Sequence, residues 1–462
     1  MAHDLVIRNG TVVTPELGQI EADVAADGDV ISSISQTGSL SGSTEVDASG
    51  KYVIPGAIDP HTHHGIYQGL ESDAETESRS DLVGGVTTIG NYFRRAGSYE
   101  EIMGEYFDQC EPYYHDFFFS LGLLTYEHIG EIPHIVDELG ITTFKWYMNY
   151  KDVAPEKFGT DCEMKDDWGD AFIQALADLE VPTTLGFHSE NVEITNALGD
   201  NPYLETDLDE DQEYRGYETL VEQFPGYAEA QSMISAAALA RQHDYDDNFY
   251  AVHISSGRTA DELATLKDAG YRMTGETCTH YLALTTEECD ERHNVNPPVR
   301  SKEDQEKLWQ RVADGTISCI GTDHCCNRSE DKIGQDVPDS LPGFPSSPTM
   351  LPLILSDGVN TNRISLERAV EVTSTNTAKA FNIFPKKGTI RVGADADLVV
   401  VDLDETKTVT PELLKSGADY SPYEGRDITG WPTHTVVRGQ LAYADGEIVG
   451  EKGYGSHIDR PI

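Results

Sequence analysis

The sequence predicts an α/β protein, a (β/α)8 TIM barrel that carries a small β-sandwich domain. Two observations lead to this prediction. In the middle of the chain, short apolar runs alternate with amphipathic helical stretches, and both chain ends are β-branched runs broken by Gly and Asp. Apolar strands separated by helices indicate a parallel sheet covered on its outer face. Eight such strands are the number that closes a barrel.

The eight candidate barrel strands are YVIPGAID, VTTIGN, DFFFSLGLL, ITTFKWY, VPTTLGF, FYAVHIS, YRMTGET and ISCIGT. Between them lie amphipathic stretches such as DDWGDAFIQALADLE and DQEKLWQRVADG. We therefore assign residues 53–385 to the barrel. The ends contain LVIRNGTVV and GTIRVGADADLVVVD, β-branched runs bounded by Gly and Asp that are typical of strands and hairpins. We assign residues 1–52 and 386–462 to one discontinuous β-sandwich domain.

Composition narrows the class of protein. The 462 residues contain no apolar run near 18 residues, so no membrane span is predicted. The start, MAHDLVIRNG, lacks a basic region followed by an apolar one, so we expect no secretory signal and a cytoplasmic location. Seven scattered cysteines without a CxxC pair argue against a disulfide framework and fit a reducing compartment.

The charge balance is strongly acidic, with 81 Asp and Glu against 33 Lys and Arg, a net charge of −48. Such a surface repels phosphate backbones and anionic lipids, which argues against nucleic-acid and membrane partners. One interpretation is a basic partner. We favour the other, a solvated acidic coat suited to the molar salt of a halophile, where the Debye length falls to roughly 3 Å.

One segment breaks the alternation of strands and helices. Residues 198–224 are long, acidic and rich in turn residues. The segment is interpreted as a lid over the pocket or as a charged surface insertion, and we favour the surface insertion.

Chemically active side chains follow five of the eight predicted strands. They are His61 and His63 after the first strand, Lys145 at the fourth, His188 at the fifth, His253 at the sixth and Asp323 at the eighth. Loops after the C-terminal ends of barrel strands converge on one mouth, where catalytic groups gather. The spacing of His61 and His63 puts both imidazoles on one side of the strand end. A lone histidine is usually a satisfied polar residue, but this set together indicates a catalytic site.

Lys145 is the unusual member of this set. A buried ammonium costs several kcal/mol unless it is paired. In a barrel it could act as a Schiff-base nucleophile. Beside four histidines we favour a modified lysine, and the resemblance below suggests the modification.

The chain contains the motifs HTHH after GAIDP, FKWYMNY, GFHSEN, AVHISS, NPPVR and GTDHC. These motifs resemble those of the amidohydrolase superfamily, specifically its dihydropyrimidinase and hydantoinase branch. The tail RISLERAVEVTSTNTAKAFNIFPKKGTIRVGADADLVVVD and the later SPYEGRDITGWPTHTVVRG are similar as well. The resemblance covers essentially the whole chain apart from the acidic insertion.

The resemblance implies two divalent metal ions, expected to be zinc. His61 and His63 would hold the more buried ion, which Asp323 completes, and His188 and His253 the more exposed one. Lys145, carboxylated by CO2, would bridge the two.

It also implies roles in catalysis and assembly. Tyr150 would polarise the scissile carbonyl, Asn296 would bind the cyclic amide through its main chain, and Asp323 would transfer the proton. The expected reaction opens a dihydropyrimidine, as in pyrimidine degradation, or a 5-substituted hydantoin to an N-carbamoyl amino acid. The resemblance also suggests a homotetramer.

The chain departs from the family pattern at several points, which leaves alternatives. His64-Gly65-Ile66-Tyr67-Gln68 stands where hydantoinases carry apolar residues, and Arg94 and Arg95 follow the second strand. The arginines would meet an acidic substrate group or pair with the acidic surface. Allantoinase and dihydroorotase are rival activities. Dihydroorotases have an arginine where Gly65 stands, so we expect hydantoin or dihydrouracil to be opened and dihydroorotate not. A rival of another class is a non-catalytic scaffold like the collapsin response mediator proteins, which have lost metal ligands.

Overall fold

A computed structural model describes residues 2–151, 154–159, 162, 164–198, 216–245 and 248–460. Most of the predicted acidic insertion, residues 199–215, lies outside the described residues. Its last part forms helix α7 (Tyr217–Gln223). Within the described ranges, no helix combines the length and the apolar character needed to cross a membrane.

The predicted barrel is present. Its eight strands are β6 (Ala57–Thr62), β7 (Val86–Arg94), β8 (Asp116–Gly122), β9 (Thr143–Tyr147), β10 (Thr184–His188), β11 (Asn248–Ala251), β12 (Met273–Cys278) and β13 (Ile317–Gly321). Neighbouring strands pair in parallel from β6 to β13. A bridge between Thr62 and His324 then joins the two edges.

One predicted strand divides in two. The run YVIPGAID breaks at Gly56 into β5 (Tyr52–Pro55), which belongs to the other sheet, and β6, the first barrel strand. A Cβ atom at Gly56 would lie 2.1 Å from the hydroxyl oxygen of Thr87. The chain therefore needs a glycine where it passes from one sheet to the other.

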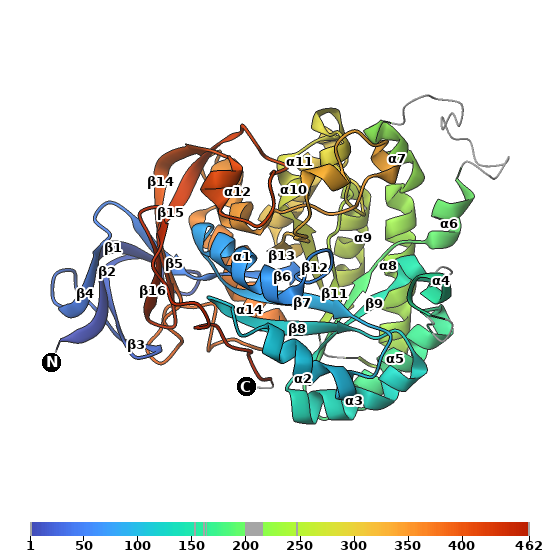
Figure 1. Ribbon diagram of the computed structural model, residues 1–462, viewed down its shortest axis with the longest axis horizontal. Coiled ribbons are helices and arrows are strands. Elements are labelled where there is room, and N and C mark those ends of the chain that lie inside the picture. Colours follow the sequence, from blue (N-terminus) through green and yellow to red (C-terminus); the bar gives the residue numbers. More distant parts are fainter. Residues whose placement is uncertain are drawn as a thin grey trace.

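Helices cover the outside of the barrel (Figure 1). The longer ones are α1 (Leu70–Val83), α2 (Tyr99–Gln109), α3 (Tyr126–Leu139), α5 (Asp166–Ala177), α8 (Gly226–Gln242), α9 (Gly257–Asp268) and α11 (Lys302–Asp314). Short helices are α4 (Ala154–Phe158), α6 (Val192–Ala197), α10 (Thr279–Ala283), α12 (Met350–Leu353), α13 (Leu366–Val370), α14 (Asn376–Ala380) and α15 (Pro411–Leu414). Ser256 and Ser301 cap α9 and α11 by accepting backbone N–H bonds, as expected for N-cap residues.

Both chain ends build the second sheet, as predicted. Its strands are β1 (His3–Thr14), β2 (Gly18–Asp27), β3 (Val30–Ser35), β4 (Gly42–Asp47), β5, β14 (Leu398–Thr408), β15 (Asp427–Val437), β16 (Gln440–Ala444) and β17 (Glu447–Ile448). Most pairs are antiparallel, and β1 pairs in parallel with β4 and β5. The sheet encloses a hydrophobic core of its own, which includes Leu5, Val24 and Leu398. The exact domain boundaries stay a prediction.

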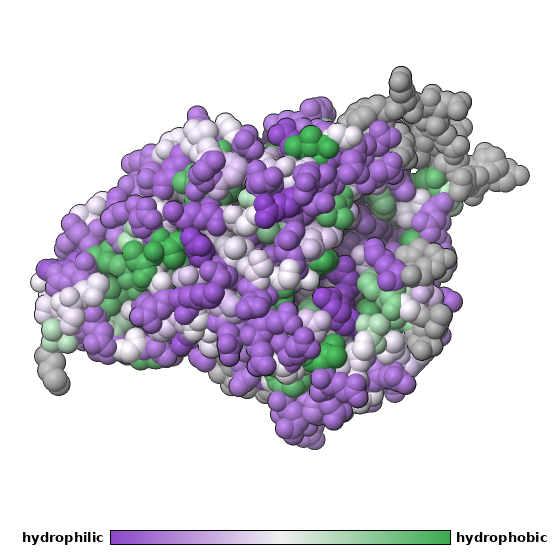
Figure 2. Space-filling model, viewed as in Figure 1, coloured by the Kyte–Doolittle hydropathy of each residue, from purple (hydrophilic) through white to green (hydrophobic). Residues whose placement is uncertain are grey.

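The face of the molecule in Figure 2 is mostly hydrophilic, and the apolar residues on it gather in separate patches.

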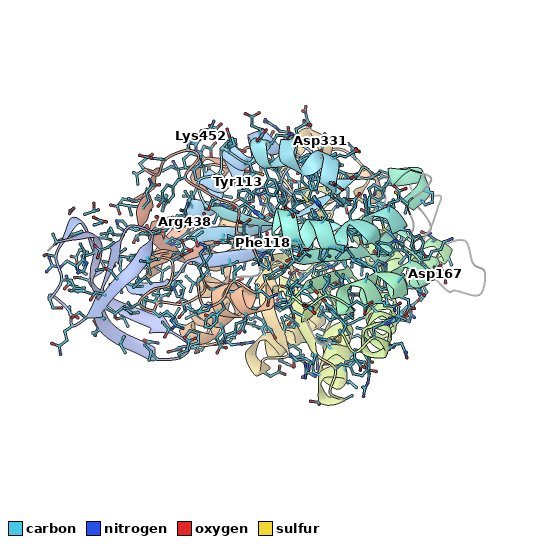
Figure 3. The ribbon with its side chains drawn as sticks, turned by 90° about the horizontal axis from the view of Figure 1, so that it is seen from below. Tyr113, Phe118, Asp167, Asp331, Arg438 and Lys452 are labelled. Carbon is cyan, nitrogen blue, oxygen red and sulfur yellow. The ribbon has the colours of Figure 1, made fainter. Side chains whose placement is uncertain are left out.

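A buried charge cluster joins the barrel to the small sheet. Lys387 Nζ lies 2.8 Å from Asp116 at the start of β8, and 2.5 Å and 3.2 Å from Asp397 and Asp395, which precede β14. Arg438, labelled in Figure 3, adds a bond to Asp116 at 3.1 Å. Burial opposes the ionisation of Asp116, but Lys387 and Arg438 outweigh it and hold its pKa below the usual value.

We predict that Lys387→Met destabilises the protein by about 3–5 kcal/mol, because it leaves clustered carboxylates buried without their cation. The measurement is the free energy of unfolding in urea. The exposed neighbour provides the control, since Lys386→Met should change this energy by no more than about 0.5 kcal/mol. The difference in unfolding free energy between the wild type and Lys387→Met should shrink as the pH falls through the range in which carboxylates titrate, because protonation removes the unpaired charges. Equal stability of the two variants would contradict a structural role for the cluster.

Candidate metal centre and active site

Three ligand atoms meet at the end of the first and last barrel strands. The Oδ1 atom of Asp323 lies 3.1 Å from His63 Nε2 and 3.3 Å from His61 Nε2. The three side chains form a buried group that could hold a metal ion. Two ligands at 2.0 Å from a tetrahedral zinc ion lie about 3.3 Å apart, so the observed spacing fits.

The other three predicted ligands adjoin this group. Lys145 Nζ on β9 lies 2.8 Å from His61 Nε2. His188 Nδ1 at the end of β10 lies 2.9 Å from His253 Nε2, which follows β11. The rings of His61 and His253 stack with centroids 5.4 Å apart. The barrel therefore brings all six side chains to one place at its C-terminal mouth.

Two of these residues have unusual backbone conformations. His253 has φ of 38° and Asp323 has φ of 52°, in the left-handed region that favours glycine. Strained backbone of this kind persists where the surrounding structure holds it, and it clusters at functional sites.

Burial sets the charge state of the site. It lowers the pKa of His63 to about 3 and the pKa of His61, His188 and His253 below the ordinary value. The imidazoles are therefore neutral, which is the form that binds metals. Burial also lowers the pKa of Lys145 to about 8. Burial opposes the ionisation of Asp323, but its contacts with His61 and its hydrogen bond with His63 outweigh that effect and keep its pKa well below the usual range.

Two acidic residues that the sequence reasoning did not assign hold the histidines in place. Glu276 Oε1 on β12 lies 2.8 Å from His61 Nδ1 and accepts the backbone N–H of His253 at 3.0 Å. Glu190 Oε2 lies 3.2 Å from His188 Nε2. A carboxylate on one ring nitrogen leaves the other nitrogen free for a metal. Glu276 lies near the end of the predicted seventh strand, YRMTGET, so the rule that placed the proposed ligands at strand ends could have identified it as well.

Two further histidines near the site are not among the proposed ligands. The Nδ1 atom of His324 accepts the backbone N–H groups of Ser346 and Ser347 at 3.1 Å. Neither ring nitrogen of His280 has a hydrogen-bond partner among the described residues. Its ring packs beside Tyr281 and Phe344 instead.

A cavity of about 150 Å³ opens next to the six side chains. Tyr150 and Asn296 both line it, together with Arg94. Tyr150 lies in the 3-10 turn η1 (Met148–Tyr150) directly after β9, and its ring stacks on Tyr147 at 5.7 Å. Asn296 Nδ2 donates to Glu190 at 3.3 Å. Both residues are thus placed to meet a molecule in the cavity.

Known proteins resemble this chain over nearly its full length. A D-hydantoinase of Geobacillus stearothermophilus is 30% identical over 478 residues, covering 98% of this chain and 96% of the relative. A D-hydantoinase of Rhizobium radiobacter is 31% identical, covering 97% and 96%. The family described as the Amidohydrolase family matches residues 226–442. The chain belongs to the amidohydrolase family, in its hydantoinase and dihydropyrimidinase branch.

Solved amidohydrolase structures confirm the predicted fold. The dihydropyrimidinase from Brevibacillus agri aligns with a TM-score of 0.87 at 28% identity, covering 98% of each chain. The L-hydantoinase (dihydropyrimidinase) from Arthrobacter aurescens gives 0.89 at 29% identity, covering 99% of this chain and all of the other. The predicted class of enzyme, a hydrolase acting on cyclic amides, is confirmed by these relatives. The roles of individual residues stay a prediction.

Proposed function

We propose that this amidohydrolase uses two metal ions to open the ring of a dihydropyrimidine or a 5-substituted hydantoin, giving an N-carbamoyl amino acid. The observation that carries the proposal is the convergence of four neutral imidazoles, one lysine and one ionised carboxylate at the barrel mouth. The names of the relatives support the choice of cyclic amide.

The proposed ligand sets follow from the contacts. His61, His63 and Asp323 would hold one ion, and His188 and His253 the other. The second pair lacks an anionic ligand, which Lys145 would supply to both ions once CO2 has carboxylated its amine. Nitrogen and oxygen ligands in a tetrahedral arrangement suit zinc. When bound, such ions lower the pKa of water from 15.7 to about 7 and so supply a nucleophile at neutral pH.

The protein side chains would then handle the substrate. Asp323 is ionised and touches both His61 and His63, so it can take the proton of the attacking water and deliver it to the departing ring nitrogen. The Tyr150 hydroxyl would donate to the carbonyl oxygen as negative charge develops there. The main chain of Asn296 would hold the cyclic amide in the cavity.

We predict that Tyr150→Phe lowers kcat by about 10²–10³-fold, the usual effect of losing one donor to the developing oxyanion. Metal content should be unchanged, because Tyr150 is not one of the proposed ligands. Steady-state kinetics on hydantoin and elemental analysis measure the two quantities. A kcat within threefold of the wild type would remove Tyr150 from the mechanism.

Carboxylation of Lys145 should depend on pH, because only the neutral amine adds CO2. Burial lowers the pKa of Lys145 to about 8, although Asp323 and Glu276 oppose the shift. Metal-free protein given zinc at constant dissolved CO2 should therefore regain activity faster as the pH rises to about 8, with a plateau above. An ordinary lysine, with a pKa of about 10.4, would show no plateau there. The rate of regain against pH measures this.

The substrate assignment is tested by a panel of hydantoin, dihydrouracil, allantoin and dihydroorotate, assayed in molar KCl. Ring opening of hydantoin or dihydrouracil is the expected result. Turnover of allantoin alone would make the enzyme an allantoinase, and turnover of dihydroorotate alone a dihydroorotase. Purified protein without metal and without activity on any of them would favour the scaffold class.

We also propose a setting for the enzyme. Its charge of −48 supports function in molar salt, as in a halophile, and the absence of disulfide bonds among the described cysteines supports the cytoplasm. Assembly as a homotetramer is proposed by analogy with the family. Light scattering in molar and in dilute salt tests the assembly and its salt dependence.

A further inference from the structure

A second cavity, of about 310 Å³, adjoins the one beside the metal ligands. The two share Ile66, Arg94 and Lys157 as lining residues. Arg95 adds a third basic residue to the second cavity, and none of its described lining residues is acidic. In the whole chain acidic residues outnumber basic ones by 81 to 33, so this local excess of positive charge runs against the composition.

Arg94 has no carboxylate partner among the described residues. Its guanidinium lies over the rings of Tyr147, Tyr150 and Phe158 at 4.9, 5.6 and 5.8 Å. Within the described part of the chain, its side chain forms one hydrogen bond, to the Tyr147 hydroxyl at 3.4 Å. Arginine cannot lose its charge in a protein, and a largely desolvated charge without a counter-ion is costly. The buried Lys387, by comparison, contacts three carboxylates.

The two other basic residues differ in what they contact. Arg95 is committed to the protein, since it donates to the Tyr106 hydroxyl at 3.1 Å and to the carbonyl of Arg94 at 2.8 Å. Lys157 has no ion pair among the described residues, and its Nζ lies 4.4 Å from the centre of the Tyr150 ring. Arg94 and Lys157 therefore both place positive charge near the Tyr150 ring, and neither has a carboxylate partner among the described residues.

The subsite also lies close to the proposed reaction centre. Lys145 Nζ and the Arg94 guanidinium each lie 4.9 Å from the centre of the same ring, that of Tyr147. Arg94 therefore lies no farther from Lys145 Nζ than twice 4.9 Å. Tyr150, the proposed donor to the carbonyl oxygen, lies beside both cations.

We propose that Arg94, assisted by Lys157, binds a carboxylate carried by the substrate, so that the preferred substrate is an anionic cyclic amide. This inference rests on the proposed function and specifies its substrate class. The carboxylate is either carried on a short side chain, as in hydantoin-5-acetate, or attached directly to the ring, as in dihydroorotate. The second case would reverse the expectation from the sequence, because Arg94 would then replace the arginine that dihydroorotases carry where Gly65 stands. Arginine suits this role because its planar fork meets both oxygens of a carboxylate. Local positive charge also offsets the repulsion of an anion by a protein of net charge −48.

The test compares each acid with its primary amide, which has nearly the same shape but no charge. The wild type should open one of the two acids with a kcat/KM about 10- to 100-fold above that of its amide, the range expected for charge-assisted hydrogen bonds. Arg94→Gln should abolish this preference while still opening the amide. Lys157→Gln should reduce it in part. Arg391→Gln removes the same charge from an exposed site in the small domain and should leave the preference intact.

A binding measurement gives a second readout. Both acids open to N-carbamoylaspartate, which carries one carboxylate more than N-carbamoylglycine. Calorimetry should show tighter binding of N-carbamoylaspartate to the wild type, and Arg94→Gln should lose that difference. If dihydroorotate is opened, the subsite accepts a carboxylate attached directly to the ring. If hydantoin-5-acetate is opened, it accepts one carried on a short side chain.

The outcomes separate this inference from the proposed function. If no cyclic amide is opened, the proposed function is wrong. If amides and neutral rings are opened but neither acid is preferred, or if Arg94→Gln keeps the preference, then the anion subsite is wrong and the hydrolase assignment stands.

Discussion

Replacing Lys145 with alanine is expected to abolish ring opening and to release at least one of the two metal ions. Lys145 Nζ lies against His61, and the His188–His253 pair has no other anionic ligand among the proposed set. Removing a residue that only hydrogen-bonds to a metal ligand lowers activity by roughly 10- to 100-fold, and the loss of kcat in Lys145→Ala should be larger. Elemental analysis and steady-state kinetics on hydantoin measure both effects.

Two controls make the Lys145→Ala result specific. Lys302→Ala removes an exposed lysine from α11 and should keep full metal content and activity. Acetate added to the Lys145→Ala protein should restore part of the metal content, because a small carboxylate can enter the space that the side chain leaves. Full metal and activity in Lys145→Ala would show that the bridging role is wrong.

The second large effect is expected at Asp323. Asp323→Asn keeps the shape of the side chain but removes its ability to take a proton, so kcat should fall by about 10²–10⁴-fold, the usual contribution of a general base. Metal affinity should fall as well, because the carboxylate touches both His61 and His63. The measurement is kcat at saturating zinc, so that the catalytic loss is separated from the weaker binding.

The control is the same substitution at an exposed aspartate in the small domain. Asp404→Asn should have no effect on kcat or on metal content. If Asp323→Asn retained kcat within a few-fold of the wild type, proton transfer would have to be assigned to another group.

Much of the fold followed from local patterns. The apolar runs of the barrel strands were recognisable because a parallel sheet covered by helices is buried on both faces. The division of the first run at Gly56 was not recognisable, because the need for a glycine there comes from the close approach of Thr87, 31 residues along the chain. The middle of the acidic insertion, residues 199–215, lies outside the described residues, so the choice between lid and surface insertion stays a prediction.

The candidate site was predictable to the extent that its residues lie at strand ends. His61, Lys145 and Asp323 could be placed by that rule, because barrel topology alone makes such positions converge. Glu190 was overlooked because its contact with His188 depends on the path of the loop after β10. Arg94 was left between two interpretations because the rings around it belong to a distant segment. Contacts of that kind require the folded structure.

The central claim is that six side chains hold two metal ions and that a carboxylated Lys145 bridges them. The most direct test is the metal content per chain of the purified protein, with native mass spectrometry of the same sample. We expect two ions per chain and a mass increase of one CO2 that is lost on acidification or in Lys145→Ala. A protein that retained two ions with Lys145 unmodified, or that bound no metal while opening the ring, would contradict the claim.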